Sequence, residues 1–139
     1  MSLEQTAYVA RRSVPARDAL QAAIDLLGFD CKLDSSFVPF QSSGFLPCVL
    51  NGQASGFEIG FEDAATIQLD FPQLVPTIGN RDVAISLRWG SDMAECASVL
   101  IVSAALAHRF AAVVHCHEDD ILYSPKQLVD EAYAALNEC

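Results

Sequence analysis

The densest group of chemically competent side chains lies in the run His115-Cys116-His117-Glu118-Asp119-Asp120. If this run begins on a strand, His115 and His117 point to the same face, because side chains alternate along a strand. Two imidazoles so placed can share a Zn²⁺ ion, with Glu118 as a further ligand. No second ligand pair occurs at a recognisable spacing. The alternative is therefore a strand end with one partly buried histidine and a solvated acidic turn.

Cys116 stands between the two histidines, and a positively charged imidazole lowers the pKa of a thiol that it can reach. Adjacent residues of a strand face opposite sides, however, so neither histidine is placed to reach the sulfur atom. The three carboxylates that follow also oppose formation of a thiolate. We therefore expect no catalytic cysteine at this position.

A second group of residues lies where a predicted strand turns into a predicted helix: Arg88, Trp89, Asp92 and Glu95. Free N–H groups at a helix N-terminus make such turns frequent ligand sites, and a desolvated carboxylate there can do acid–base chemistry. Asp92 and Glu95 also fit a capping box, which explains both residues without a ligand. The sequence leaves a small-molecule site and a purely structural turn open.

Acidic residues dominate the charge of the chain, with 18 acids, 8 bases and a formal net charge of −10. This charge disfavours binding to nucleic acids and to anionic membranes, and it would steer a basic partner toward the protein. No Lys or Arg lies between Leu33 and Asn80. The acids of this stretch expected to meet such a partner are Glu58, Glu62, Asp63 and Asp70. The alternative is that acidity only keeps an apolar-rich small protein in solution.

The five cysteines are odd in number and form no CxxC pair, and residues 1–12 contain no apolar core of signal-peptide length. These features favour free thiols in a reducing cytoplasm. The longest uninterrupted run of apolar or small residues, Cys96–Ala107, is too short for a membrane span of about 20 residues. A buried helix is the better interpretation of this run.

Periodicity predicts the elements that would position these groups. Alternating or β-branched runs predict strands at Thr6–Arg12, Phe45–Leu50, Gly56–Phe61, Val83–Trp89 and Ala111–His115, with a short one at Ile121–Tyr123. Apolar stripes and caps predict a helix that starts near Ser13 and ends before Gly28, a long one over about 92–109, and a last one that begins at Ser124. The stretch Asp63–Asn80 predicts a short helix or an irregular excursion.

This order predicts one α+β domain over residues 1–139. We expect a two-layer sandwich with a mostly antiparallel sheet of four to five strands and about three helices on one face, and a ferredoxin-like variant is among the arrangements that fit. The helix over about 92–109 is apolar or small nearly all round, so it should be buried on more than one side.

The sequence contains no Walker, GxSxG, HExxH or dinucleotide-binding motif, so a non-enzymatic role is favoured. The leading interpretation is a small acidic cytoplasmic protein that binds a macromolecular partner, as an inhibitor, immunity or regulatory protein for a basic protein would. Two alternatives stay open. One is a metal-binding protein or metalloenzyme centred on His115 and His117, with zinc as the ion. The other is a small-molecule-binding domain near Arg88, Trp89 and Asp92. No other cofactor is expected, and a homodimer is left open.

Overall fold

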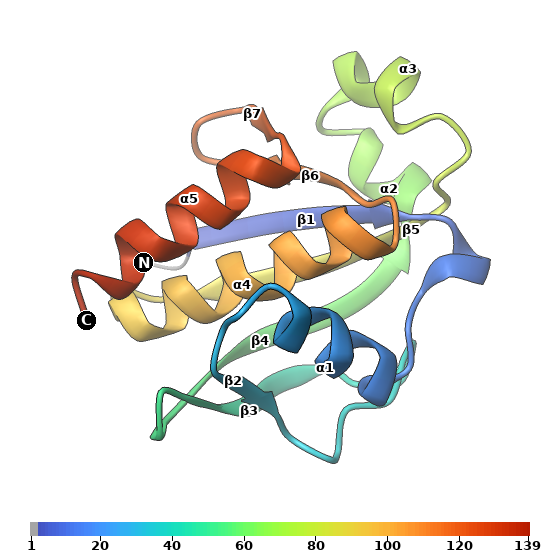
Figure 1. Cartoon of the computed structure of the whole chain (residues 1–139). Helices are drawn as coiled ribbons and strands as arrows, with labels where there is room; N and C mark the ends of the chain where they lie inside the picture. Colours follow the sequence, from blue (N-terminus) through green and yellow to red (C-terminus); the bar gives the residue numbers. More distant parts are fainter. Residues whose placement is uncertain (1–2) are drawn as a thin grey trace.

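The computed structural model describes residues 3–139, and Figure 1 shows the arrangement of its helices and strands. The strands are β1 (Leu3–Val9), β2 (Cys31–Leu33), β3 (Gly44–Leu50), β4 (Gln53–Asp63), β5 (Val83–Trp89), β6 (Val113–Cys116) and β7 (Ile121–Tyr123). The α-helices are α1 (Arg17–Leu26), α2 (Ala64–Gln68), α3 (Val75–Ile78), α4 (Met93–Arg109) and α5 (Pro125–Leu136). Two short 3₁₀ helices are η1 (Arg11–Ser13) and η2 (Pro72–Leu74).

All seven strands form one sheet in the order β2-β3-β4-β5-β1-β6-β7, and every neighbouring pair is antiparallel. The α+β class holds, but the expected four to five strands were too few. Strands β2 and β7 have three residues each, which is too short for an alternating pattern to stand out from chance. The first strand also begins at Leu3 rather than Thr6, so Glu4 belongs to the sheet.

The number of helices was also underestimated, since the structure has five α-helices. In Figure 1, α1, α4 and α5 lie over one face of the sheet. The segment 63–80 contains α2, η2 and α3, in agreement with the expected excursion. It packs on the other face through a small separate core of Tyr8, Ala64, Leu74, Ile78 and Ala84. The expectation of helices on one face only was therefore wrong.

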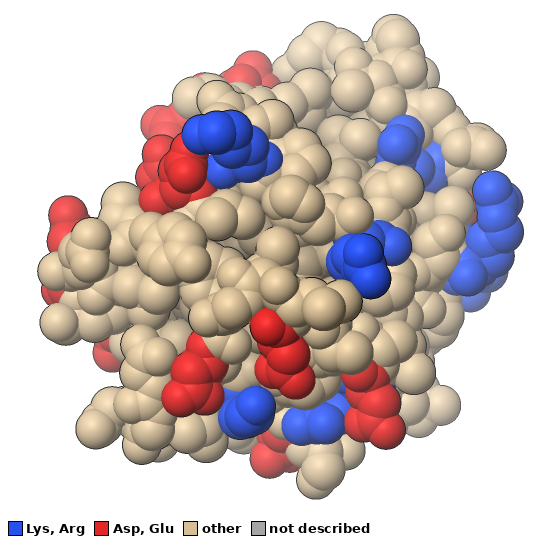
Figure 2. Space-filling view, in the orientation of Figure 1, with Lys and Arg blue, Asp and Glu red and all other residues tan. Residues whose placement is uncertain are grey.

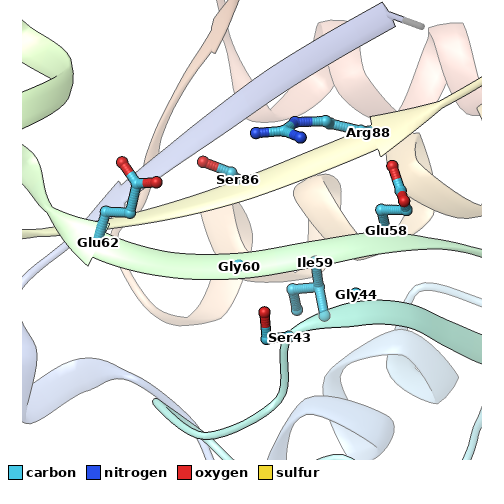
Figure 3. A pocket seen from close by; sticks show the side chains of 8 residues that line it. All are labelled: Ser43, Gly44, Glu58, Ile59, Gly60, Glu62, Ser86 and Arg88. Atoms are coloured by element: carbon cyan, nitrogen blue, oxygen red, sulfur yellow. The ribbon is translucent and has the colours of Figure 1, made fainter.

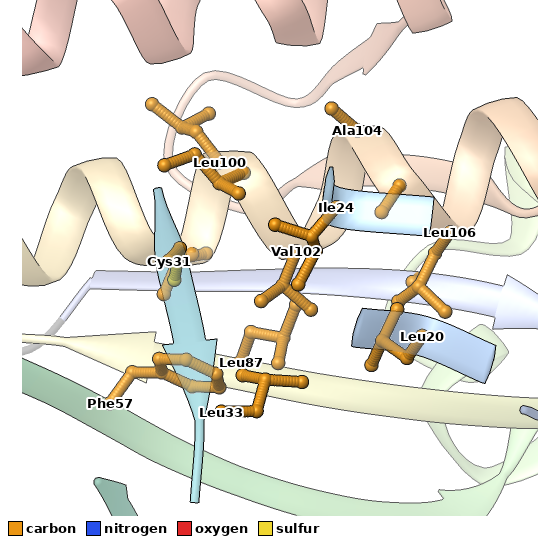
Figure 4. Packing of buried hydrophobic residues seen from close by; sticks show 14 of the residues in the cluster. Leu20, Ile24, Cys31, Leu33, Phe57, Leu87, Leu100, Val102, Ala104 and Leu106 are labelled. Carbon is orange, nitrogen blue, oxygen red and sulfur yellow. The ribbon is translucent and has the colours of Figure 1, made fainter. Parts of the chain in front are cut away.

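Helix α4 is the centre of the main core, as its composition predicts. It is buried continuously from Ala97 to Ala107. Figure 4 shows Val102 and Leu106 directed toward α1 and the inner face of the sheet, and Leu100 on the opposite side of the helix. The small residues of the helix allow close approach to its neighbours on several sides, so this one element joins α1, α5 and the sheet.

Local signals at several turns are confirmed. Asn51 and Gly52 both have positive φ, 49° and 80°, at the turn between β3 and β4. Asp92 caps α4 by accepting hydrogen bonds from the backbone N–H groups of Ala94 and Glu95. The capping box at Ser124 of α5 is complete. Ser13 does not cap α1, however, because it lies in η1 and the helix starts at Arg17.

All five cysteines are free. Cys31, Cys48 and Cys116 are buried, as expected for thiols that behave as small apolar side chains. Cys139 is exposed. No helix within residues 3–139 is long and apolar enough to cross a membrane.

Candidate functional site

The face of the sheet opposite α4 carries two rows of side chains that run across the strands. The first row consists of Glu58, Arg88, Glu4 and His117. The second row, two residues along each strand, consists of Gly60, Ser86, Thr6 and His115. Residues paired directly across an antiparallel sheet share a face, so these eight residues lie on one side. The segments that supply them, which are β1, β4, β5 and the end of β6 with His117, lie far apart in the sequence.

A groove opens on this face between Glu58 and Glu62, two acids of β4. Its volume is about 250 Å³, and its lining is Ser43, Gly44, Glu58, Ile59, Gly60, Glu62, Ser86 and Arg88. Figure 3 shows Glu58 and Glu62 rising from β4 on either side of Gly60, with Ser86 and Arg88 beside them on β5. A Cβ atom at Gly60 would meet no atom within 4 Å. The missing side chain of Gly60 therefore leaves the middle of the groove open.

The groove carries a negative net charge although an arginine lines it. The Nε atom of Arg88 lies 3.2 Å from Glu4 Oε1, so the guanidinium is already paired on its far side. Glu58 and Glu62 form no ion pair among the described residues. Three carboxylates against one guanidinium leave a formal charge of −2 on the residues Glu4, Glu58, Glu62 and Arg88. A cation is therefore attracted to this surface.

The two histidines of the sequence motif do face the same side, and their ring centroids lie 5.4 Å apart. His115 Nε2 lies 2.7 Å from Asp120 Oδ1, and His117 Nε2 lies 2.6 Å from Thr6 Oγ1. The ring of Phe71, from the segment 63–80, meets both imidazoles edge-on at centroid distances of 4.5 Å and 4.9 Å. The histidines are thus held by the sheet and by the segment that covers it.

These contacts bear on the zinc interpretation. Glu118, the third residue of the expected ligand set, accepts a hydrogen bond from the backbone N–H of Glu4 at 2.9 Å. Within residues 3–139, no three His, Cys, Asp or Glu side chains stand close enough together to hold a metal ion. The geometry thus gives a shared metal no support.

Glu4, His117 and Thr6 form an acid–imidazole–hydroxyl arrangement that the sequence did not predict. The Nδ1 atom of His117 lies 3.8 Å from Glu4 Oε2, while its Nε2 atom contacts the Thr6 hydroxyl. An acid, an imidazole and a hydroxyl in this order can activate a nucleophile. The Thr6 side chain is 0% exposed, however, so no substrate reaches its oxygen. We interpret the three residues as a partly buried group in which Thr6 and His117 are hydrogen-bonded and Glu4 lies at ion-pair distance from His117. Glu4 was not among the predicted site residues, because the first strand was expected to begin at Thr6 and it begins at Leu3.

Two buried polar atoms beside this group lack a protein partner among residues 3–139, namely Tyr8 Oη and His115 Nδ1. Burial, with added repulsion from Glu4 and Asp70, raises the pKa of Tyr8 to about 12, which keeps the phenol protonated. An unsatisfied buried polar group costs about 1–3 kcal/mol.

Acidification should weaken the fold through His117. Burial lowers the pKa of its imidazole, although Glu4, Glu118 and Asp70 oppose the effect and His115 adds to it. The unfolded chain then binds more protons than the native protein below about pH 6.5, so stability falls as the pH decreases from 7. Urea unfolding between pH 7.5 and 5.5 should show a smaller loss in His117→Gln than in the wild type. Equal losses in the two proteins would contradict this assignment.

The predicted turn site consists of Arg88, Trp89, Asp92 and Glu95. Some of these residues stabilise the start of α4, and some line a surface hollow. Asp92 is the N-cap of α4, and Glu95 Oε1 accepts a hydrogen bond from the backbone N–H of Gly90 at 3.2 Å. Arg88, Trp89 and Glu95 line a shallow hollow of about 400 Å³ that also includes Glu58. Trp89 is 8% exposed and Arg88 points to the opposite face of the sheet. The hollow adjoins the groove at Gly60, because Glu58 and Arg88 line both of them.

The four acids expected to meet a partner lie in three different places. Glu58 and Glu62 flank the same groove, as the alternation in their strand predicts. Asp63 ends β4 and lines another surface hollow beside α2, and Asp70 follows α2 close to His117 and Tyr8. On the helix side of the molecule, several bases lie beside acids and large areas are uncharged (Figure 2). The pair Glu58 and Glu62 is the part of the set that shares one cavity.

Sequence analysis did not single out Gly60 or Ser86. Their only signal was the position of Gly60 between Glu58 and Glu62 on the polar face of one strand. Comparisons with protein families, with curated proteins and with solved structures found no match for this chain. The chemistry of the open sheet face is therefore the basis for assigning a function.

Proposed function

We propose that this protein binds a basic protein partner through the part of its sheet that no helix covers. The single observation that supports this most is the acidic groove at Glu58 and Glu62 on an open face of a seven-stranded sheet. The formal net charge of −10 adds a long-range attraction for a basic partner. Asp63 and Asp70 lie near the border of this face and add to the field that such a partner meets.

Exposed apolar side chains on the same face support a protein partner rather than a small cation. Phe45 on β3 lies directly opposite Glu58 and is 60% exposed, and Val49 lies four residues further along the same strand. Protein interfaces combine aromatic and aliphatic contacts with a polar rim. The groove and the β3 side chains together form one surface, which we call the β3–β5 face: Phe45, Val49, Glu58, Glu62 and Arg88.

The proposed setting is the cytoplasm, which the five free thiols favour because reducing compartments keep cysteines unpaired. A surface that attracts a basic protein suits an inhibitor, an immunity protein or a regulatory protein. Such proteins act by covering part of a partner, so affinity and association rate decide their effect.

The test measures association kinetics with the partner, isolated from the native source and identified by mass spectrometry. Replacing both Glu58 and Glu62 by lysine should slow association by at least about tenfold at low salt and flatten its dependence on ionic strength. The matched control replaces Glu131 and Glu138, two exposed acids of α5 and the chain end, by lysine. It makes the same change in net charge away from the β3–β5 face and should slow association much less.

Equal slowing by the two double variants would mean that net charge alone drives association, and the β3–β5 face would then have no special role. An unchanged rate in both variants would contradict the proposal altogether. Thermal unfolding of each variant shows whether a slower rate comes from loss of the fold.

A further inference from the structure

We propose that the groove over Gly60 is a socket for one arginine side chain of the partner, held by Glu58, Glu62 and Ser86. This inference rests on the proposed function and specifies the chemistry of its central contact. The groove is the place on the β3–β5 face where space, charge and an unused polar group coincide.

Space for a side chain comes from Gly60. Its neighbours on the same face of β4, Glu58 and Glu62, rise on either side and leave the strand backbone open between them (Figure 3). The backbone of Gly60 needs no glycine, because its φ is not in the left-handed region and a Cβ atom there would touch nothing. Glycine at this position weakens a strand without a conformational reason, which is typical of a site where another group approaches closely.

The hydroxyl of Ser86 is the second, independent sign of a ligand. Ser86 lies opposite Gly60 on β5, lines the groove and is 5% exposed. Its hydroxyl forms no hydrogen bond with any other residue that the structure describes. The oxygen atom is accessible from the groove, since Ser86 lines it, so a donor that enters the groove can pair with this hydroxyl. The open position above Gly60 is where such a donor would lie.

Charge selects a cation as the occupant. Glu4 pairs with the Nε atom of Arg88, and the guanidinium lies beside Ser86 in Figure 3, so a second cation would enter on the Glu58 and Glu62 side of the groove. Glu58 and Glu62 then remain as two carboxylates without an ion-pair partner in residues 3–139. A cation that enters the groove would form favourable ion pairs with Glu58 and Glu62 and reduce the repulsion between their carboxylates.

The spacing of the two acids favours arginine over lysine. Glu58 and Glu62 are four residues apart on one strand, so their Cα atoms are about 13 Å apart. Both glutamate side chains must turn toward Gly60 to meet one cation, and a compact ammonium group requires a larger inward turn than the wider guanidinium does. A guanidinium carries five N–H donors on several edges and can bond to both carboxylates and to the Ser86 oxygen together.

The direct test is an NMR titration of the protein with N-acetyl-arginine amide. We expect saturable shifts of the backbone amide signals of Gly60 and Ser86. The lysine analogue should bind at least about threefold more weakly, and the uncharged citrulline analogue should cause no saturable shift. Equal binding of the arginine and citrulline analogues, or arginine shifts centred elsewhere, would overturn the socket.

Filling the groove provides the matched variants. Gly60→Tyr puts a large side chain into the open space without a change of charge, and it should abolish the titration shifts and speed dissociation of the partner at least about tenfold. Gly60→Ala adds only a methyl group and should reduce arginine binding far less. Unchanged dissociation of the partner from a folded Gly60→Tyr protein would overturn the socket. The thermal midpoint and amide spectrum of each variant show that it is folded.

Failure of the socket and failure of the proposed function give different results. If Gly60→Tyr is without effect while the Glu58/Glu62 lysine variant still slows association, the face binds the partner but the groove is no socket. If both variants leave the kinetics unchanged, the partner does not use the β3–β5 face, and the socket is wrong with it.

Discussion

Replacing Ile101 by alanine should lower the free energy of unfolding by about 2–5 kcal/mol. Ile101 lies in the middle of α4, is 0% exposed and belongs to the main core between the sheet and the helices. Removal of its side chain leaves a cavity that the neighbouring elements cannot close, because α4 contacts both other long helices and the sheet. Urea unfolding at neutral pH measures the loss directly.

Leu26→Ala is the control for this experiment. Leu26 also lies on a helix, α1, but is 68% exposed, so its removal should change stability by no more than about 0.5 kcal/mol. Leu100, which neighbours Ile101 and is also buried, gives a second measurement at the same core. Losses below about 1 kcal/mol for both Ile101→Ala and Leu100→Ala would mean that α4 does not pack as described.

The second large effect is expected at Gly56 on β4. A Cβ atom there would overlap the Phe45 ring and lie 2.7 Å from the backbone oxygen of Leu46, and its φ of 155° is also unusual for other residues. The ring can move, but the backbone of the paired strand β3 cannot move without loss of the ladder. Gly56→Ala should therefore cost about 1–3 kcal/mol, as overpacking does in other proteins. Thermal or urea unfolding tests this.

Gly60→Ala is a closely matched control, because Gly60 lies on the same strand and the same face. Its Cβ atom would meet no neighbour, so stability should stay unchanged or rise by about 0.4–1 kcal/mol through a less flexible unfolded chain. A loss at Gly60 equal to that at Gly56 would contradict the difference in packing between the two positions. It would also remove the argument that the groove is open at Gly60.

The two faces of the sheet explain why stability and proposed binding can be studied separately. Ile101 and its neighbours pack on the inner face, whereas Glu58, Gly60 and Ser86 lie on the outer one. Substitutions in the groove therefore remove few core contacts. The segment 63–80 is the exception on the outer face, since it covers Tyr8 and the histidines and closes that end of the sheet.

Local patterns in the sequence determined several elements on their own. The cap at Asp92 and the apolar run after it set the limits of α4, and Asn51-Gly52 set the turn between β3 and β4. Alternation in β4 put Glu58, Gly60 and Glu62 on one wet face. Each of these features depends on contacts within a few residues, so a periodic pattern or a cap is enough to predict it.

Tertiary structure alone decided which strands are neighbours. The placement of β1 between β5 and β6 brings Glu4 to Arg88 and Thr6 to His117, although about 80 to 110 residues separate the members of each pair. The three-residue strands β2 and β7 exist because longer neighbours supply their hydrogen bonds. Such pairings depend on register between distant segments, which no local periodicity encodes. The acids were therefore predictable from the sequence, and the groove that two of them share was not.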